Sequence, residues 1–116
     1  MAVLTAAKIR DLLDAEVVVG QDKMDMQVEE ACGADLMSDV LAFVKDQGML
    51  LTGLCNPQVI RTAEMMDLHC VVFVRGKEID PSIVELARSR DIIVLQTRHR
   101  MFSACGLLYM GGLRGE

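Results

Sequence analysis

A turn with the residue types of an anion-binding loop follows the apolar residues 49–52. The sequence continues Gly53-Leu54-Cys55-Asn56-Pro57, so a glycine and a helix start stand directly behind a predicted buried strand. Such turns can hold phosphates, because the first amides of a helix point outward without a partner. A cysteine at this position could also act as a nucleophile, since a helix N-terminus lowers the pKa of a thiol.

The residues around this turn do not complete a catalytic site. A phosphate loop of the form G-x-x-x-x-G-K-[ST] needs a lysine, and neither a lysine nor a second glycine follows Gly53. Cys55 has no base nearby in the sequence, so we interpret it as a small residue packed beside the turn. Asp35 and Asp39 could share a helix face and bind Mg²⁺, but a helix cap and a solvated acid explain them as well. We therefore expect no catalytic residue, metal or cofactor, and neither hydrolase nor kinase activity.

Small polar and basic residues follow three of the predicted strands. The carboxyl ends of parallel strands meet at one edge of a sheet, so the loops after these strands should converge there, together with Gly76 and His99. Four basic groups and a helix start would form an anion-binding site. The alternative is that they are solvated loop charges and ordinary caps. The candidate ligand-binding residues are Thr52, Gly53, Asn56, Arg75, Lys77, Thr97, Arg98 and Arg100.

Strands and helices alternate along the chain. The strands are apolar throughout, and the helices between them have about ten residues, which predicts an α/β fold of three layers with a mostly parallel sheet and helices on both faces. Both prolines stand just inside predicted helices, behind the caps Asn56 and Asp80. The predicted elements are helix 5–14 capped by Thr5, strand 16–20, a little-structured segment 21–27, strand 28–35, helix 36–46 capped by Asp35 and ended by Gln47-Gly48, strand 49–53, helix 56–66, strand 70–74, helix 80–90, strand 91–96 and helix 101–110.

Composition limits the classes of function. The 116 residues suit a single domain, 1–116, and 52% hydrophobic with 25% charged residues is a globular balance. A net charge of −5 argues against a nucleic-acid-binding protein. The charge is uneven, since residues 1–58 carry four basic against ten acidic groups and residues 59–116 carry eight against seven, so an anion site is expected in the second half.

No apolar run is long enough to cross a membrane and no signal peptide is recognised, so we expect a cytoplasmic protein without membrane contact. The four scattered cysteines are interpreted as buried hydrophobes.

The apolar composition also predicts a symmetric homodimer. The mean hydropathy is +0.31 in a short chain, so surplus apolar surface has to be covered. Two methionine-containing segments, Met65-Met66 and Met101 to Met110, are the expected contact regions.

Most of the chain resembles the DRTGG domain family. The resemblance rests on the stretches ADLMSDVLAFV, LLTGLCNPQVIRTAEMMDLHCVVFVRGKEIDPSIVELARSRDIIVLQT and MFSACGLLYMGGL and covers residues 3–113, although only Thr52-Gly53 matches part of the literal string DRTGG. It implies a fold like the N-terminal domain of HPr kinase/phosphorylase, whose kinase activity belongs to another domain. Related domains stand beside CBS domains in regulated pyrophosphatases and in some phosphate acetyltransferases, and stand-alone versions occur beside hydrogenase genes in anaerobic bacteria and archaea.

Two functions follow as expectations. The first is a regulatory module that senses a phosphorylated or nucleotide metabolite at the carboxyl edge of the sheet and acts through a dimer. The second is a dimerisation or docking module for a partner enzyme, for example a hydrogenase-associated one, without a small-molecule ligand.

Overall fold

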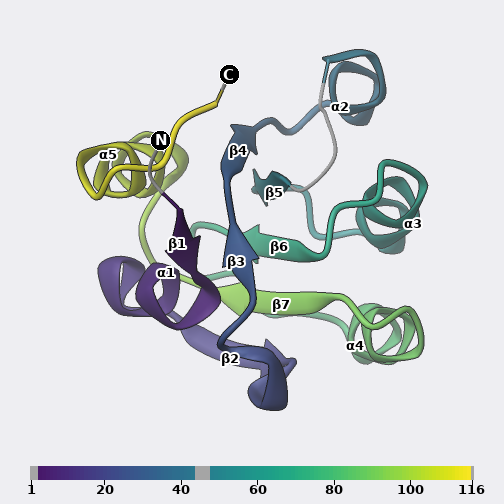
Figure 1. The fold of residues 1–116 in the computed structure, drawn as a ribbon. Coiled ribbons are helices and arrows are strands. Elements are labelled where there is room, and N and C mark those ends of the chain that lie inside the picture. Colours follow the sequence, from purple (N-terminus) through teal and green to yellow (C-terminus); the bar gives the residue numbers. More distant parts are fainter. Residues whose placement is uncertain (1–2, 44–47, 116) are drawn as a thin grey trace.

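A five-stranded sheet forms the centre of the chain in the computed structural model, which describes residues 3–43 and 48–115 (Figure 1). Four neighbouring strands are parallel, and the fifth, at one edge, is antiparallel to its neighbour, which confirms the mostly parallel sheet expected from the sequence. Across the sheet the order is β2 (Glu16–Val19), β7 (Ile93–Gln96), β6 (Cys70–Phe73), β5 (Gly48–Thr52) and β4 (Glu30–Gly33).

Helices cover both faces of the sheet, as Figure 1 shows. On one face lie α1 (Ala6–Leu13) and α5 (Met101–Met110), and on the other lie α2 (Met37–Phe43), α3 (Pro57–Met65) and α4 (Pro81–Ser89). The buried strands supply both cores, because successive side chains of a strand point to opposite faces. In β6, Cys70 and Val72 pack toward α1 and α5, whereas Val71 and Phe73 pack toward α2, α3 and α4.

Three helices begin at the caps expected from the sequence. The Thr5 hydroxyl accepts a hydrogen bond from the Lys8 amide at 3.1 Å and so caps α1. At α3 and α4 a capping side chain is followed by proline at the first helical position. A backbone N–H at this position would have no hydrogen-bond partner within the helix, so proline costs no hydrogen bond there. These caps fix the directions in which the chain leaves β5 and β6.

The segment between β2 and β5 differs from the expectation. Residues 21–27 contain a short 3-10 helix, η1 (Gln21–Lys23), and the start of β3 (Gln27–Val28), which pairs antiparallel with β1 (Leu4–Thr5). The strand expected over 28–35 is therefore divided between β3 and β4. The expected helix 36–46 is observed up to Phe43; its remaining residues and the Gln47 part of the predicted stop lie outside the described residues, and Gly48 belongs to β5.

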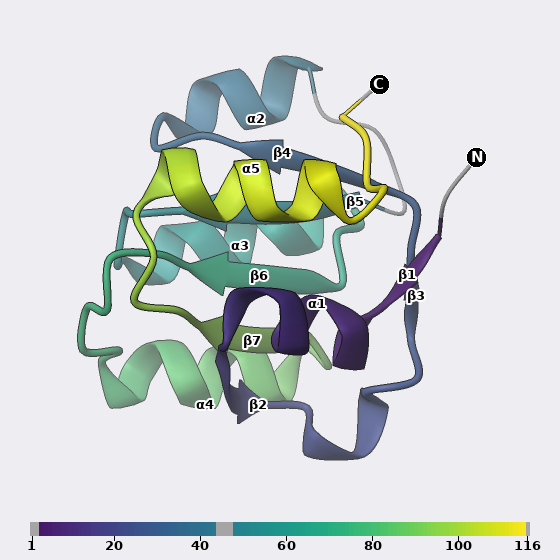
Figure 2. The same cartoon turned by 90° about the vertical axis from the view of Figure 1, so that its left-hand side faces the viewer.

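The loops after β6 and β7 lead to opposite faces of the sheet. The chain passes from β6 to α4 on one face, but from the neighbouring strand β7 to α5 on the other (Figures 1 and 2). Adjacent loops that diverge in this way leave a crevice at the carboxyl ends of the strands, which is the usual position of ligands in open α/β sheets. Within 3–43 and 48–115, no helix combines the length and apolarity that a membrane span requires.

Candidate functional site

The structure brings the three predicted ligand-binding loops together at the carboxyl edge. The loop after β6 bonds to the loop after β7 through two amides: Arg75 N donates to His99 O at 2.8 Å, and Gly76 N donates to Thr97 O at 2.9 Å. Val74 N donates to Thr52 O at 3.0 Å and so joins the end of β6 to that of β5. The edge is thus a continuous backbone network rather than a set of separate loops.

The glycine turn after β5 is occupied by side chains of the protein itself. One carboxylate oxygen of Asp35 accepts hydrogen bonds from Gly53 N at 2.7 Å and from the Thr52 hydroxyl at 3.3 Å. Arg75 Nη2 donates to Gly53 O at 3.0 Å, and a Cβ added to Gly53 would lie 2.5 Å from that nitrogen. Thr52 and Gly53 are buried under these groups. Asp35 therefore holds the Thr52-Gly53 part of the turn, whereas the helix start that the sequence suggested for a phosphate lies at Asn56-Pro57. The predicted role of Asp35 as the cap of α2 is corrected, because this helix begins at Met37 and Leu36 is the residue before it.

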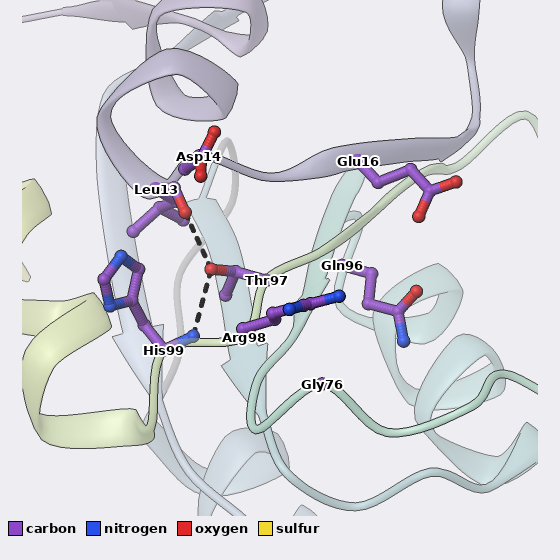
Figure 3. A pocket seen from close by; sticks show the side chains of 8 residues that line it. All are labelled: Leu13, Asp14, Glu16, Gly76, Gln96, Thr97, Arg98 and His99. Carbon is purple, nitrogen blue, oxygen red and sulfur yellow. Dashed lines mark hydrogen bonds between the residues drawn. The ribbon is translucent and has the colours of Figure 1, made fainter.

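A cleft of about 450 Å³ opens beside this turn, between the end of β7, the start of β2 and the loop after β6. Figure 3 shows the side chains that surround it. Thr97 forms its floor: the buried hydroxyl donates to Leu13 O at 2.8 Å and accepts from His99 N at 3.3 Å. The lining residues are Leu13, Asp14, Glu16, Gly76, Gln96, Thr97, Arg98 and His99.

Two of the predicted ligand-binding residues, Thr97 and Arg98, line this cleft. Asn56 instead caps α3, where its side-chain oxygen accepts from Gln58 N at 2.8 Å. The backbone oxygen of Lys77 accepts a hydrogen bond from Gln96 Nε2. Arg100 is exposed and directly precedes the first residue of α5. Thr52, Gly53 and Arg75 form the neighbouring turn. Five of the eight predicted residues thus lie in the cleft or in this turn, whereas Asn56, Lys77 and Arg100 lie in neither.

The sequence prediction did not include the acidic wall of the cleft. Asp14 ends α1 in a left-handed conformation with φ 49°, and Glu16 begins β2, where it is paired with Gln96. Both enter the site because β2 is antiparallel to β7 and so begins where β7 ends. The sequence carried no signal for that orientation, since β2 reads as a short apolar strand like the others.

The charges around the cleft are mixed. Arg98 contributes a guanidinium and Asp14 and Glu16 contribute carboxylates, with the imidazole of His99 beside them (Figure 3). None of the ion pairs in the described part of the chain involves Arg75, Lys77, Arg98 or Arg100. A ligand with both an anionic part and hydrogen-bond donors would find complementary groups here.

The chemistry of the cysteines does not indicate a nucleophile. Burial raises the pKa of the Cys55 thiol, and the nearby charge of Lys77 offsets only part of that rise. The Cys55 sulfur lies 3.6 Å from Glu78 O, to which the thiol donates. Burial alone raises the pKa of Cys70 to about 12. Both groups are therefore protonated thiols at neutral pH rather than the thiolate that attack requires.

No assembled metal site is found where the structure describes the chain. In residues 3–43 and 48–115, no three side chains of His, Cys, Asp or Glu converge as ligands would. The two acids considered for Mg²⁺ differ in role, because Asp35 bonds to the glycine turn while Asp39 lies exposed in the first turn of α2.

Fold and site together define a small three-layer α/β domain with a polar cleft at the carboxyl edge of its sheet. The chain belongs to the DRTGG domain family, whose sequence model matches residues 8–109. This match confirms the resemblance drawn from residues 3–113. No curated protein sequence matches the chain.

A solved structure shares the fold. The chain is similar to the crystal structure of the CBS and DRTGG domains of the regulatory region of Clostridium perfringens pyrophosphatase, complexed with the activator diadenosine tetraphosphate. The TM-score is 0.72 at 20% sequence identity, over 86% of this chain and 44% of the other. The present chain thus corresponds to less than half of that regulatory region.

Proposed function

We propose that this chain is a non-catalytic regulatory module that binds a phosphorylated or nucleotide metabolite in the cleft at the carboxyl edge of the sheet. The observation that carries the proposal is the cleft itself, about 450 Å³ in volume, at the point where the loops after β6 and β7 diverge, with Arg98 on its wall. This volume is within the range of small-molecule sites, about 300–1,000 Å³.

The lining residues suit the parts of a nucleotide. The guanidinium of Arg98 can form charged, two-pronged hydrogen bonds to a phosphate group. Gly76, with φ 63°, lets the backbone approach a ligand closely. Glu16 and Asp14 can accept hydrogen bonds from ribose hydroxyls or from an amino group of a base, as acidic residues do in other nucleotide sites.

The structural neighbour supports this class of ligand. That pyrophosphatase has a DRTGG domain in its regulatory region and was crystallised with a dinucleotide activator. A regulatory role for the present chain fits its membership of the DRTGG domain family and the protonated thiols of Cys55 and Cys70. Arg100 and Lys77 directly follow the lining residues His99 and Gly76 in the sequence and are exposed, so they are available to further phosphates of a dinucleotide.

Calorimetric titration with a panel of adenine and guanine mononucleotides and diadenosine tetraphosphate tests the proposal. Replacing Arg98 and Arg100 together by Ala is expected to weaken binding at least about tenfold, since a hydrogen bond to a charged group contributes about 1.5–3 kcal/mol. Arg61→Ala with Arg88→Ala is the matched control, because it removes the same charge from exposed positions on α3 and α4. Binding should also weaken as salt rises.

A flat titration of the wild-type protein across the panel would contradict the proposal. Equal loss of affinity in the two double variants would also contradict it, because the effect would then come from net charge rather than from the cleft.

The second function, dimerisation or docking onto a partner enzyme, is favoured by a different observation. Exposed apolar side chains gather on α5, and none of them lines the cleft. Such a surface can bind a partner without any metabolite.

A further inference from the structure

Helix α5 exposes large apolar side chains and has no charge of its own. None of its ten residues, Met101–Met110, is acidic or basic. Phe102 is 91% exposed, Met110 86% and Tyr109 59%. In Figure 2, α5 lies across the front of the molecule beside α1, with no other drawn element in front of it. Depletion of charge with enrichment of aromatic and methionine side chains is typical of the centre of a protein interface.

Gly106 lies at the middle of this exposed surface, and packing within the subunit does not explain why this residue is glycine. A Cβ added there would meet no heavy atom within 4 Å, so packing inside the subunit does not require glycine. By contrast, Cβ atoms added at Gly33 or Gly111 would lie within 2.8 Å of a neighbouring side chain. Glycine inside a helix lowers helix stability. A helical glycine that internal packing does not require therefore indicates a constraint from outside the subunit. What the missing side chain provides is room for another backbone to approach from outside.

The exposed residues are arranged symmetrically about this glycine. Phe102 stands four residues before Gly106 and Met110 four residues after it, so all three lie along one side of the helix. If a second α5 crosses antiparallel at Gly106, Phe102 of each copy meets Met110 of the other. Such a surface is complementary to itself, as a two-fold axis requires. Thioether and aromatic groups also attract one another.

The charge at the helix ends favours the same antiparallel arrangement. α5 has no acid in its first turn, and Arg100 flanks its N-terminus, where its own helix dipole is unfavourable to a cation. Antiparallel pairing moves Arg100 beside the C-terminal end of the other α5, which carries partial negative charge. Arg100 then stabilises the pair instead of opposing its own helix.

The available area is sufficient for a stable contact. Aromatic side chains of this kind bury about 150–250 Å² each. Phe102, Tyr109 and Met110 together therefore supply about half of the roughly 800 Å² per subunit that a standard interface buries. The remainder would come from the exposed residues beside them, Ser103, Arg100 and Arg114, the last of which has its guanidinium 3.9 Å from the centroid of the Tyr109 ring.

We propose that the α5 outer face, formed by Phe102, Ser103, Gly106, Tyr109 and Met110, binds a second copy of this chain, with the two helices crossing antiparallel at Gly106. The dimer is expected to form without the ligand proposed for the cleft. It also selects between the two contact regions expected from the sequence, since α5 has the symmetric pattern whereas Met65 is exposed on α3 beside a half-buried Met66.

Sedimentation equilibrium of the wild type and three variants tests this interface. The wild type is expected at twice the chain mass of 12.8 kDa at micromolar concentration. Phe102→Glu should raise the dissociation constant at least about tenfold, as interface centres do when truncated. Gly106→Leu should weaken the dimer as well, although it favours the isolated helix, so loss of the dimer cannot be attributed to loss of fold. Met65→Glu is the matched control and should leave the dimer intact.

Circular dichroism of each variant confirms that it is folded. A wild-type chain that stays at 12.8 kDa up to about 0.1 mM would overturn the proposal, because interfaces of this size usually bind more tightly. A dimer that survives both Phe102→Glu and Gly106→Leu, or that dissociates with Met65→Glu, would overturn the assignment to α5.

Discussion

At the scale of single residues, Asp35 holds the glycine turn after β5 by a contact that the sequence did not predict. Its carboxylate accepts hydrogen bonds from Gly53 N and the Thr52 hydroxyl. Replacing it by Ala leaves the buried Gly53 amide without this partner, and an unsatisfied buried donor costs about 1–3 kcal/mol. We therefore expect Asp35→Ala to lower the free energy of unfolding by about that amount in urea titrations.

Two further variants make that prediction specific. Asp35→Asn keeps an acceptor oxygen and should lose less stability. Asp39→Ala, at an exposed acid in the first turn of α2, should cost less than about 1 kcal/mol. Equal losses from Asp35→Ala and Asp39→Ala would show that the turn does not depend on the carboxylate.

Residues of the site were predictable only where their signals were local. Asn56 and Asp80 were identified as caps because each stands directly before a proline and a helical pattern. The partner of Gly53 is 18 residues away in the sequence, and that of Thr97 is 84 residues away. No spacing rule connects such pairs, so the occupied turn and the floor of the cleft could be seen only in the folded chain.

At the scale of elements, the cap of α4 gives a pH dependence whose sign is fixed. Hydrogen bonds from the Ser82 amide and hydroxyl lower the pKa of Asp80. A carboxyl group whose pKa is lower in the folded state than in the unfolded state stabilises the fold at any pH above its unfolded-state pKa. This stabilisation is lost as the pH falls through the folded-state pKa. The difference in urea midpoint between the wild type and Asp80→Ala should therefore be largest at neutral pH and shrink below about pH 3.9.

The cap of α3 provides the control for this experiment. Asn56 has the same geometry, with a 2.8 Å hydrogen bond from the amide two residues on and a proline between, but its side chain does not titrate. Asn56→Ala should cost about 1 kcal/mol at every pH at which the protein is folded. If the Asp80 difference stayed as constant with pH as the Asn56 difference, the charge of Asp80 would not contribute to the cap.

Element types were predicted well because hydrophobic periodicity and caps determine them locally, but strand direction was not. β2 has the same apolar character as the parallel strands, and only its pairing with β7 shows that it runs the other way. α1, which precedes β2, packs beside α5 on one face of the sheet, a contact between segments far apart in the sequence. The acidic wall of the cleft was missed for the same reason.

At the scale of the whole molecule, the cleft and the α5 outer face are joined by one short segment. Arg98 lines the cleft, and α5 begins at Met101, three residues later. The segment between them is held by Arg75 N, which donates to His99 O, and by the hydroxyl of Thr97, which accepts from His99 N. A ligand that draws Arg98 inward acts on a backbone that leads directly into the proposed interface.

This connection predicts reciprocal coupling between ligand and dimer. If a nucleotide has a higher affinity for the dimer than for the monomer, it must lower the dissociation constant of the dimer, because the two equilibria are linked. Sedimentation equilibrium of the wild type with and without a saturating nucleotide should give different dissociation constants, typically by about 5-fold or more for coupling of 1–3 kcal/mol. Titration of the monomeric Phe102→Glu variant should then show a nucleotide affinity altered in the matching direction, although Phe102 does not line the cleft. Unchanged dimer dissociation with bound nucleotide, together with equal nucleotide affinity in the wild type and Phe102→Glu, would mean that the cleft and the α5 outer face act independently.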